Sequence, residues 1–271
     1  MRGANPLQSR GLLFVFSLAG GLLLAFILIP LLRMYTTQTP ASLMRVAGTA
    51  DVMSAIWLSL EAAFITALLA GVLGIPLAYI LSRMSFPGKR VVEALVDLPL
   101  TVPHTVVGIA LLYVFGRTGI IGAPIDKLTG LKFWGTTGGI VVAMLFVSVP
   151  YTVNSARIGF EGVDSRLEKV ARTLGAGPWG VFGRVTFPLA LRGVLTGLML
   201  TYARAISEFG AVIILSYYPM TAPVKIYDLF LQTGLRESTA MAVLFLTIAL
   251  ILFIILRQLA RGIGYQKDRD S

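Results

Sequence analysis

Six long apolar runs, separated by polar stretches, set the pattern of this chain. A helix needs about 17–25 apolar residues to cross a bilayer, and runs of roughly this length cover residues 12–32, 54–81, 94–115, 138–158, 189–215 and 239–256. The pattern predicts an all-α membrane protein with six transmembrane helices in a single transmembrane domain, 1–271. The first run exceeds the roughly 7–15 apolar residues of a secretory signal, and no small-residue cleavage site follows it. We therefore expect a retained helix there.

A charged, glycine-punctuated segment between the fourth and fifth runs, from Glu161 to Ala190, interrupts this pattern. Ser165, followed three residues later by Glu168, predicts a capping box at a helix start. Apolar residues then recur at helical spacing, at Leu167, Val170, Ala171 and Leu174. The segment therefore predicts a short amphipathic helix outside the apolar runs.

Glycine and proline predict where this helix ends and a second one begins. Gly175 and Gly177 suit a helix stop, and Pro178 suits the first position of the next helix. The apolar face then continues at Trp179, Phe182 and Val185, until Pro188 closes the unit. Two roles are open for such a hairpin: a docking element for a soluble partner, or an amphipathic hairpin resting on lipid headgroups.

Lysine and arginine counts predict the orientation of the helices. With the N-terminus inside, 15 of the 23 basic residues fall in inside segments, seven fall in outside segments, and Arg204 lies within a span. Because basic residues concentrate on the cytoplasmic side, both termini and the loop 161–188 are expected in the cytoplasm. The same bias accounts for most of the net charge of +10, which therefore does not by itself indicate an anionic ligand or nucleic acid.

Composition excludes several kinds of site. The chain has 271 residues, of which 56% are hydrophobic and 13% charged, as expected for an integral membrane protein rather than a globular enzyme. It has no cysteine, which excludes disulfides and thiolate metal sites, and its one histidine, His104, cannot form a histidine cluster. We expect no metal site and no catalytic residue, and we interpret His104 as a polar residue of a helix.

Polar residues inside the apolar runs are candidates for the transport path, since each is costly in hydrocarbon. Arg204 and Glu208 are four residues apart, which places them on one predicted helix face. Two roles are open for this pair: a structural ion pair that neutralises itself between helices, or direct contacts with the ligand. Glu61 is interpreted as structural. In the third run, Pro99 and Pro103 should distort the start of the helix, so that Thr101 and Thr105 line a pathway with freed carbonyls.

The polar segment resembles the EAA loop of ATP-binding-cassette (ABC) importer permeases, with matches at Ala171, Gly175, Val185, Phe187 and Pro188. It departs from that pattern at two positions, where Lys169 replaces the usual glutamate and Val170 an alanine. In that family the loop contains the coupling helix, which inserts into a groove of a cytoplasmic ATPase. The resemblance implies that the ATPase-coupling residues are Leu167, Glu168, Lys169, Ala171, Leu174, Gly175, Trp179, Phe182 and Pro188.

Two further segments narrow the resemblance. ARAISEFGAV, residues 203–212, is similar to the signature of permeases for molybdate, tungstate, sulfate and thiosulfate, and LPLTVPHTVVGIALL, residues 98–112, resembles a second segment of that group. The resemblance covers roughly residues 54–256 and is greatest to the molybdate/tungstate branch. The pore or structural polar candidates are accordingly Arg204, Glu208, Thr101, Pro103 and Thr105.

The resemblance implies a type I importer in the cell membrane. It would contain two copies of this subunit, two ABC ATPase subunits that bind ATP and Mg²⁺, and an extracytoplasmic oxyanion-binding protein. The chain lacks the phosphate-binding pattern GxxxxGK[ST], so ATP hydrolysis is expected on the partner, with no cofactor in this chain. Sulfate or thiosulfate transport is the alternative. A self-sufficient secondary transporter is more distant, since no internal repeat is evident, and an intramembrane enzyme more distant still.

Overall fold

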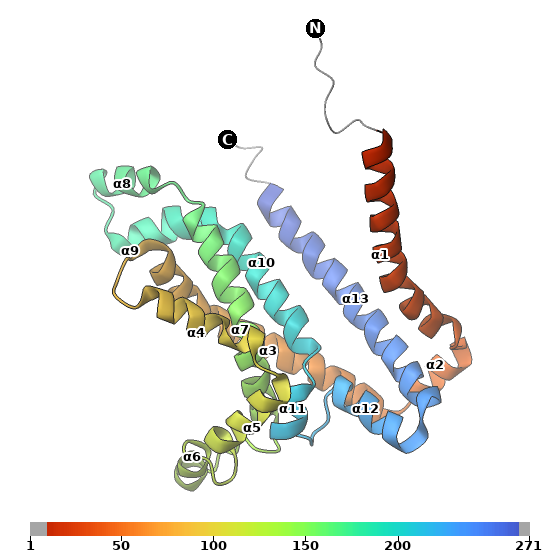
Figure 1. Ribbon diagram of the computed structural model, residues 1–271. Helices are drawn as coiled ribbons and strands as arrows, with labels where there is room; N and C mark the ends of the chain where they lie inside the picture. The colour runs from red at the N-terminus through yellow and green to blue at the C-terminus, as the bar shows by residue number, and fades with distance from the viewer. Residues whose placement is uncertain (1–9, 266–271) are drawn as a thin grey trace.

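A computed structural model of the protein describes residues 10–265. The terminal segments 1–9 and 266–271, which bear on the predicted location of the termini, lie outside the described residues. The described chain is helical, without strands, and its helices are α1 (Arg10–Thr36), α2 (Pro40–Ala47), α3 (Ala50–Arg83), α4 (Lys89–Thr101), α5 (His104–Phe115), α6 (Gly122–Thr129), α7 (Thr137–Glu161), α8 (Ser165–Thr173), α9 (Pro178–Val181), η2, a π-helix (Phe182–Thr186), α10 (Phe187–Ile206), α11 (Gly210–Leu215), α12 (Ala222–Thr233) and α13 (Leu235–Tyr265) (Figure 1).

Five of these helical stretches are long and apolar enough to cross a membrane, and a sixth span results if the bent pair α4–α5 is counted as one. The multi-pass membrane architecture predicted from the apolar runs is therefore present. Runs 12–32, 54–81, 138–158 and 239–256 lie within α1, α3, α7 and α13.

The third predicted span, 94–115, is broken rather than merely distorted at its start. The axes of α4 and α5 differ by 113°. Val102 is extended (φ −79°, ψ 132°) because it precedes Pro103, which disfavours helical backbone at the preceding residue. Pro103 therefore divides the span in two, whereas Pro99 lies inside α4.

The fifth predicted span, 189–215, was wrong as one continuous helix. The helix begins earlier, at Pro178, and runs through η2 and α10 to Ile206. Pro188 does not close the hairpin, because it occupies the first turn of α10, where its missing N–H is tolerated after the π-helical turn. A second short helix, α11, begins only at Gly210, after a break at 207–209.

Close packing of small residues holds α3, α7 and α10 together in the centre of the bundle. A Cβ added to Gly193 of α10 would lie 2.6 Å from the Cα of Gly159 on α7, and one added to Gly197 would lie 3.0 Å from the Cα of Thr152. On α3, a Cβ at Gly74 would meet the Thr152 and Val153 side chains at 3.2–3.3 Å. Helices in membranes associate by such backbone approach, because lipid gives no hydrophobic driving force between them.

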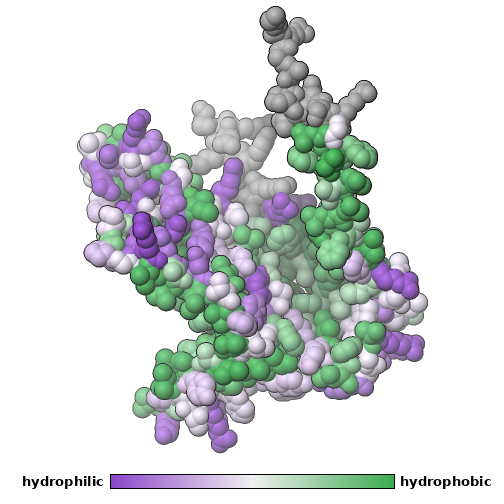
Figure 2. Space-filling view, in the orientation of Figure 1, coloured by the Kyte–Doolittle hydropathy of each residue, from purple (hydrophilic) through white to green (hydrophobic). Residues whose placement is uncertain are grey.

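The first helix stands apart from this bundle (Figure 1). No residue in the apolar window of α1 is buried. Its contact with α13 includes a hydrogen bond of 2.8 Å between the hydroxyls of Tyr35 and Thr247. Hydrophobic residues cover α1, whereas hydrophilic residues gather around α8 and the neighbouring end of the bundle (Figure 2). We call the end that carries α8 and α9 the α8 end, and the opposite end, which carries α6, the α6 end.

Candidate functional site

The predicted hairpin at 161–190 begins with α8, but its cap differs from the prediction. Asp164, not Ser165, is the N-cap residue, and its carboxylate accepts a hydrogen bond of 2.8 Å from the Arg166 N–H. Glu168 does not complete a capping box, because its side chain points inward and is buried. The proposed Ser165–Glu168 box is therefore wrong, since an aspartate one residue earlier takes the capping position.

The end of α8 follows the glycine prediction. Gly175 has a positive φ of +87°, which a residue with a Cβ rarely adopts. The Gly175 N–H donates to the Arg172 carbonyl at 3.0 Å, and the Ala176 N–H donates to the Ala171 carbonyl at 3.0 Å. This pair of bonds is the Schellman motif. Pro178 then opens α9 in its first turn, as predicted.

Four large apolar side chains of this hairpin point into open space. We call Leu167, Val170, Leu174 and Trp179 the docking face. Leu174 is 82% exposed and Trp179 87% exposed, and the other two are about half exposed. The surface over the region of α8 is largely hydrophilic (Figure 2). An apolar patch with a polar surround is typical of an interaction surface.

The other predicted coupling residues are placed differently. Lys169 is exposed, and Ala171 and Pro188 are partly buried. Phe182 turns inward, where its ring centroid lies 5.0 Å from Tyr79 and 5.8 Å from Phe187. Phe182 therefore secures the hairpin to the bundle rather than extending the docking face.

Glu168 lies in a polar cluster with Arg83 and Thr186, and we call these three residues the Glu168 anchor. The Glu168 Oε1 accepts hydrogen bonds from Arg83 Nη2 at 2.8 Å, from Arg83 Nε at 3.1 Å and from the Thr186 hydroxyl at 2.8 Å. Arg83 Nη2 also donates to the Val163 carbonyl at 3.1 Å. One carboxylate oxygen thus connects the last residue of α3, the helix α8 and the π-helical turn that leads into α10.

A second cluster, the helix-break network, comprises His104, Arg204 and Glu208. Arg204 Nη2 donates to Glu208 Oε2 at 2.7 Å, and the same oxygen lies 3.0 Å from His104 Nδ1. Glu208 Oε1 accepts the Ala211 N–H at 2.8 Å. The fully buried Glu208 therefore caps the first turn of α11 while pairing with the last turn of α10, which supplies a physical reason for the break at 207–209.

His104 was missed as a member of this cluster. It is the first residue of α5, directly after the break at Pro103, and Arg204 Nη2 lies 2.8 and 3.0 Å from its two ring nitrogens. The break between α4 and α5 and the break between α10 and α11 therefore meet at one place. A signal was available: a lone histidine beside a helix-breaking proline, in a chain that also buries an arginine and a glutamate.

The predicted hydroxyl groups lie next to these breaks. Thr101 and Thr105 are exposed, as is Ser207 in the second break, and the Thr101 hydroxyl donates to the Leu98 carbonyl at 2.9 Å. Pro103 is exposed between the two threonines. The structure thus brings Pro103, His104 and Thr105 together with Arg204 and Glu208, and places the exposed residues Thr101 and Ser207 beside them.

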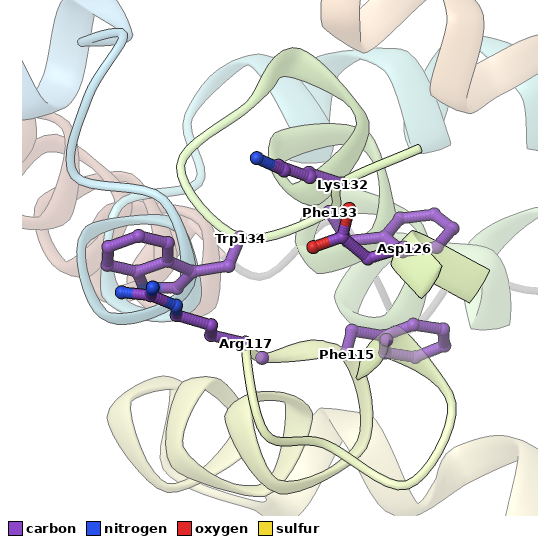
Figure 3. Close-up of a pocket in the computed structure, with 8 residues that line it drawn as sticks. Phe115, Arg117, Asp126, Lys132, Phe133 and Trp134 are labelled. Atoms are coloured by element: carbon purple, nitrogen blue, oxygen red, sulfur yellow. The ribbon is translucent and has the colours of Figure 1, made fainter. Parts of the chain in front are cut away.

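At the α6 end, a pocket of about 320 Å³ opens between the end of α5, the helix α6 and the loop that precedes α7. Its walls include the aromatic side chains of Phe115, Phe133 and Trp134 and the charged side chains of Arg117, Asp126 and Lys132 (Figure 3). Neither Arg117 nor Lys132 forms an ion pair with any residue in the described range 10–265. The pocket therefore presents two unpaired cations and one carboxylate among aromatic walls.

An exposed apolar hairpin at one end, broken spans with buried charges in the middle and small-residue helix packing together describe a membrane transport subunit. The family model for the "binding-protein-dependent transport system inner membrane component" matches residues 70–265, and the chain belongs to this family.

Named relatives lie within the same family. The chain is 44% identical over 249 residues to the molybdate/tungstate transport system permease protein WtpB of Thermococcus kodakarensis, covering 91% of this chain and 95% of that protein. It is 40% identical over 206 residues to the molybdenum transport system permease protein ModB of Escherichia coli K12, covering 74% of this chain and 90% of that protein.

Solved structures show the fold. A crystal structure of a bacterial ABC transporter for import of the acidic polysaccharide alginate matches with a TM-score of 0.75 at 17% identity, covering 94% of this chain and 97% of that chain. The methionine ABC transporter MetNI, in an inward-facing conformation, matches with a TM-score of 0.61 at 16% identity, covering 78% of this chain and 95% of that chain. The type I ABC importer permease fold predicted from the sequence is confirmed.

Proposed function

We propose that this chain is the pore subunit of an ATP-driven importer for molybdate or tungstate. The observation that carries the proposal is the docking face, whose exposed Leu174 and Trp179 lie on a hydrophilic end of a membrane bundle. The permeases named for molybdate and tungstate, at 38–44% identity, support the choice of oxyanion. Sulfate or thiosulfate remains the alternative substrate.

In this proposal two copies of the subunit form the pore, and the α8 end faces the cytoplasm. The excess of basic residues in the segments at this end supports that orientation. Each docking face inserts into a groove of an ABC ATPase, which binds the ATP and Mg²⁺. An extracytoplasmic binding protein delivers the oxyanion to the α6 end, where the pocket with Arg117 and Lys132 offers unpaired cations to acidic groups of that protein.

Alternating access then follows from the position of the docking face. Closure of the two ATPases on ATP draws the two α8 helices together and opens the pore outward, and hydrolysis returns it to the inward-facing state. Because the binding protein selects the anion, the pore needs only a modestly polar path. The exposed hydroxyls of Thr101, Thr105 and Ser207 beside the helix breaks supply such a path.

The helix-break network is proposed to hold the broken spans in place. Glu208 has no free carboxylate oxygen, since Oε1 caps α11 and Oε2 binds Arg204 and His104. The charges of Arg204 and Glu208 also cancel, so the network does not trap a passing dianion. This arrangement favours the structural interpretation of the pair over a direct ligand role.

Purification and reconstitution test the proposal directly. We expect the chain to copurify with an ABC ATPase and to give vesicle uptake that requires both ATP and a binding protein. Competition among labelled molybdate, tungstate, sulfate and thiosulfate then identifies the substrate, with molybdate and tungstate competing at the lowest concentrations. Uptake by the isolated chain driven by an ion or proton gradient would overturn the proposal, and preferential competition by sulfate would overturn the choice of oxyanion.

A single substitution tests the docking assignment. Gly175→Glu places a side chain at φ +87° and a charge beside Leu174, so ATPase association or coupled uptake should be lost while membrane insertion is retained. Insertion is checked by the amount of folded protein in the membrane. Normal uptake by this variant would contradict the assignment of the docking face.

A further inference from the structure

The helix α8 has few contacts that could carry force into the membrane bundle. It has nine residues, a length at which an isolated helix is marginal in water, and seven of them are exposed. Glu168 is its one buried residue and Ala171 is partly buried. Its chain connections, through 162–164 and 174–177, are a tight turn and a glycine loop. Any push or pull on α8 must therefore reach the bundle through these links, through the partly buried Ala171 or through Glu168.

The Glu168 anchor reaches two spans that flank the hairpin. Arg83 is the last residue of α3, and Thr186 ends the π-helical turn that continues into α10. Both donate to the same oxygen, Glu168 Oε1, at 2.8 Å. Arg83 also holds the Val163 carbonyl in the turn between α7 and α8. A displacement of Glu168 thus acts on α3 and α10 at once.

The environment of the anchor leaves water little access to the Glu168 carboxylate. The side chain of Glu168 is 7% exposed and that of Arg83 18% exposed. Separating a buried carboxylate from its donors is costly, because the charge is left without solvation. The two spans should therefore follow α8 rather than let the hydrogen bonds break.

We propose that Glu168 is a positioning residue that ties the docking helix to α3 and α10, rather than a contact for the ATPase. The tie transmits movement of α8 to the cytoplasmic ends of two pore helices. This inference rests on the proposed function, since it assigns a mechanical role within ATP-driven transport. At position 168 the side chain faces inward, whereas Lys169 at the next position is exposed.

A neighbouring ion pair provides a matched control. Arg157 on α7 pairs with Glu93 of α4 at 2.9 Å and with Glu161 on its own helix at 3.1 Å. These charges lie near the same end of the bundle, but none of them is on α8. Glu161 is 45% exposed, so Glu161→Gln removes a carboxylate without touching the docking helix.

The experiment compares Glu168→Gln, Thr186→Val, Thr186→Ser and Glu161→Gln in the full transporter, reconstituted with its ATPase and binding protein. Two quantities are measured: the amount of ATPase that copurifies, and the oxyanion taken up per ATP hydrolysed. Glu168→Gln removes the negative charge that Arg83 and Thr186 donate to, and Thr186→Val removes one donor, so uptake per ATP should fall about tenfold in the first and about threefold to tenfold in the second. Thr186→Ser, which keeps the hydroxyl, and Glu161→Gln should match the wild type.

The outcomes separate the tie from a simple stabilising contact. If Thr186→Val and Glu168→Gln lower the yield of complex but leave uptake per ATP unchanged, the tie is overturned. Wild-type ratios in both variants at normal yield overturn it as well. If Glu168→Gln does not assemble, Thr186→Val against Thr186→Ser decides the question. A wild-type chain that shows no ATP-dependent uptake defeats the proposed function itself, which distinguishes that failure from failure of the tie.

Discussion

Two buried carboxylates, Glu168 and Glu208, each bind an arginine and a third polar side chain. The two arginines lie at very different distances from their glutamates in the sequence. Glu208 pairs with Arg204, four residues away, whereas Glu168 pairs with Arg83, 85 residues away. The Glu208 cluster lies at a break inside the membrane bundle, and the Glu168 cluster lies at its polar end. The Glu208 cluster holds the break between α10 and α11, and the Glu168 cluster holds the surface helix α8 against the spans.

The comparison shows which partners a sequence reveals. The i, i+4 spacing predicts an ion pair between Arg204 and Glu208 from local geometry alone, and the pair forms even though Glu208 lies just beyond the end of α10. Neither Arg83 nor Thr186 carries a local signal that points to Glu168. Substitutions at Glu208 and Glu168 test the difference between the two clusters, and substitutions at Gly175 and in the α6-end pocket test the two ends of the bundle.

The largest effect is expected for Glu208→Ala. It leaves Arg204 without a counter-charge inside the membrane and uncaps α11, so stability should fall by about 3–5 kcal/mol. The measurement is thermal or denaturant unfolding of the protein in detergent. Glu61→Ala is the matched control, because Glu61 is an exposed carboxylate of span α3 with no hydrogen bond or ion pair to residues 10–265. Equal losses in the two variants would contradict the role assigned to Glu208.

A smaller and local effect is expected for Glu168→Ala. About 2–3 kcal/mol should be lost, because Arg83 is near the polar end and partly exposed, so that water can solvate it after the change. The loss should appear as faster proteolysis within residues 162–177, with little change in unfolding of the spans. If Glu168→Ala destabilises the whole protein as much as Glu208→Ala does, without extra cleavage at α8, the local role assigned to Glu168 is contradicted.

Gly175→Ala should cost about 1–2 kcal/mol, the price of a Cβ at positive φ. Gly177→Ala is the control, since Gly177 has φ −68° and open space around it. Two quantities are measured: the affinity of this subunit for its ATPase, and the resistance of the hairpin to protease. Identical behaviour of the two alanine variants would show that the Schellman turn does not set the position of the docking face.

The smallest effect on stability is expected at the α6 end. The double change Arg117→Gln and Lys132→Gln removes two unpaired cations, so unfolding should not change measurably. Stimulation of the ATPase by the binding protein should weaken, with the remaining effect less sensitive to salt. Lys127→Gln, an exposed neighbour outside the pocket, should leave stimulation unchanged. Unaltered stimulation in the double variant would exclude this pocket from docking.

Much of the fold follows from apolar run length, and the errors have identifiable causes. Hydropathy located the runs but not the breaks, because an apolar run resumes beyond the few polar residues at each break. The first break depends on the conformation required before Pro103, and the second on a side chain, Glu208, that replaces a backbone partner. Pro188 was misjudged as a stop because the preceding π-helical turn accommodates it.

The site was predictable to the extent that its contacts are local. The glycine at 175 and the stripe from Leu167 to Leu174 identified the hairpin and its exposed face. The stripe could not show that Phe182 turns toward Tyr79, since that depends on a residue a hundred positions away. His104 was dismissed because a lone histidine carries no spacing pattern, and its partners became evident only when the two breaks came together.

The glycine contact between α7 and α10 has a mechanical consequence. A Cβ built at Gly193 would lie 2.6 Å from the Gly159 Cα, so the two backbones are in direct contact, with no side chains between them that could slide past one another. The helices α7 and α10 should therefore move together as one rigid body, with α8 attached to its polar end. Bending is left to the places where hydrogen-bonded helix is interrupted, at 102–103 and 207–209. The hinge of this motion then lies at His104, Arg204 and Glu208. Small displacements of α8 should therefore become rotations at the opposite side of the pore.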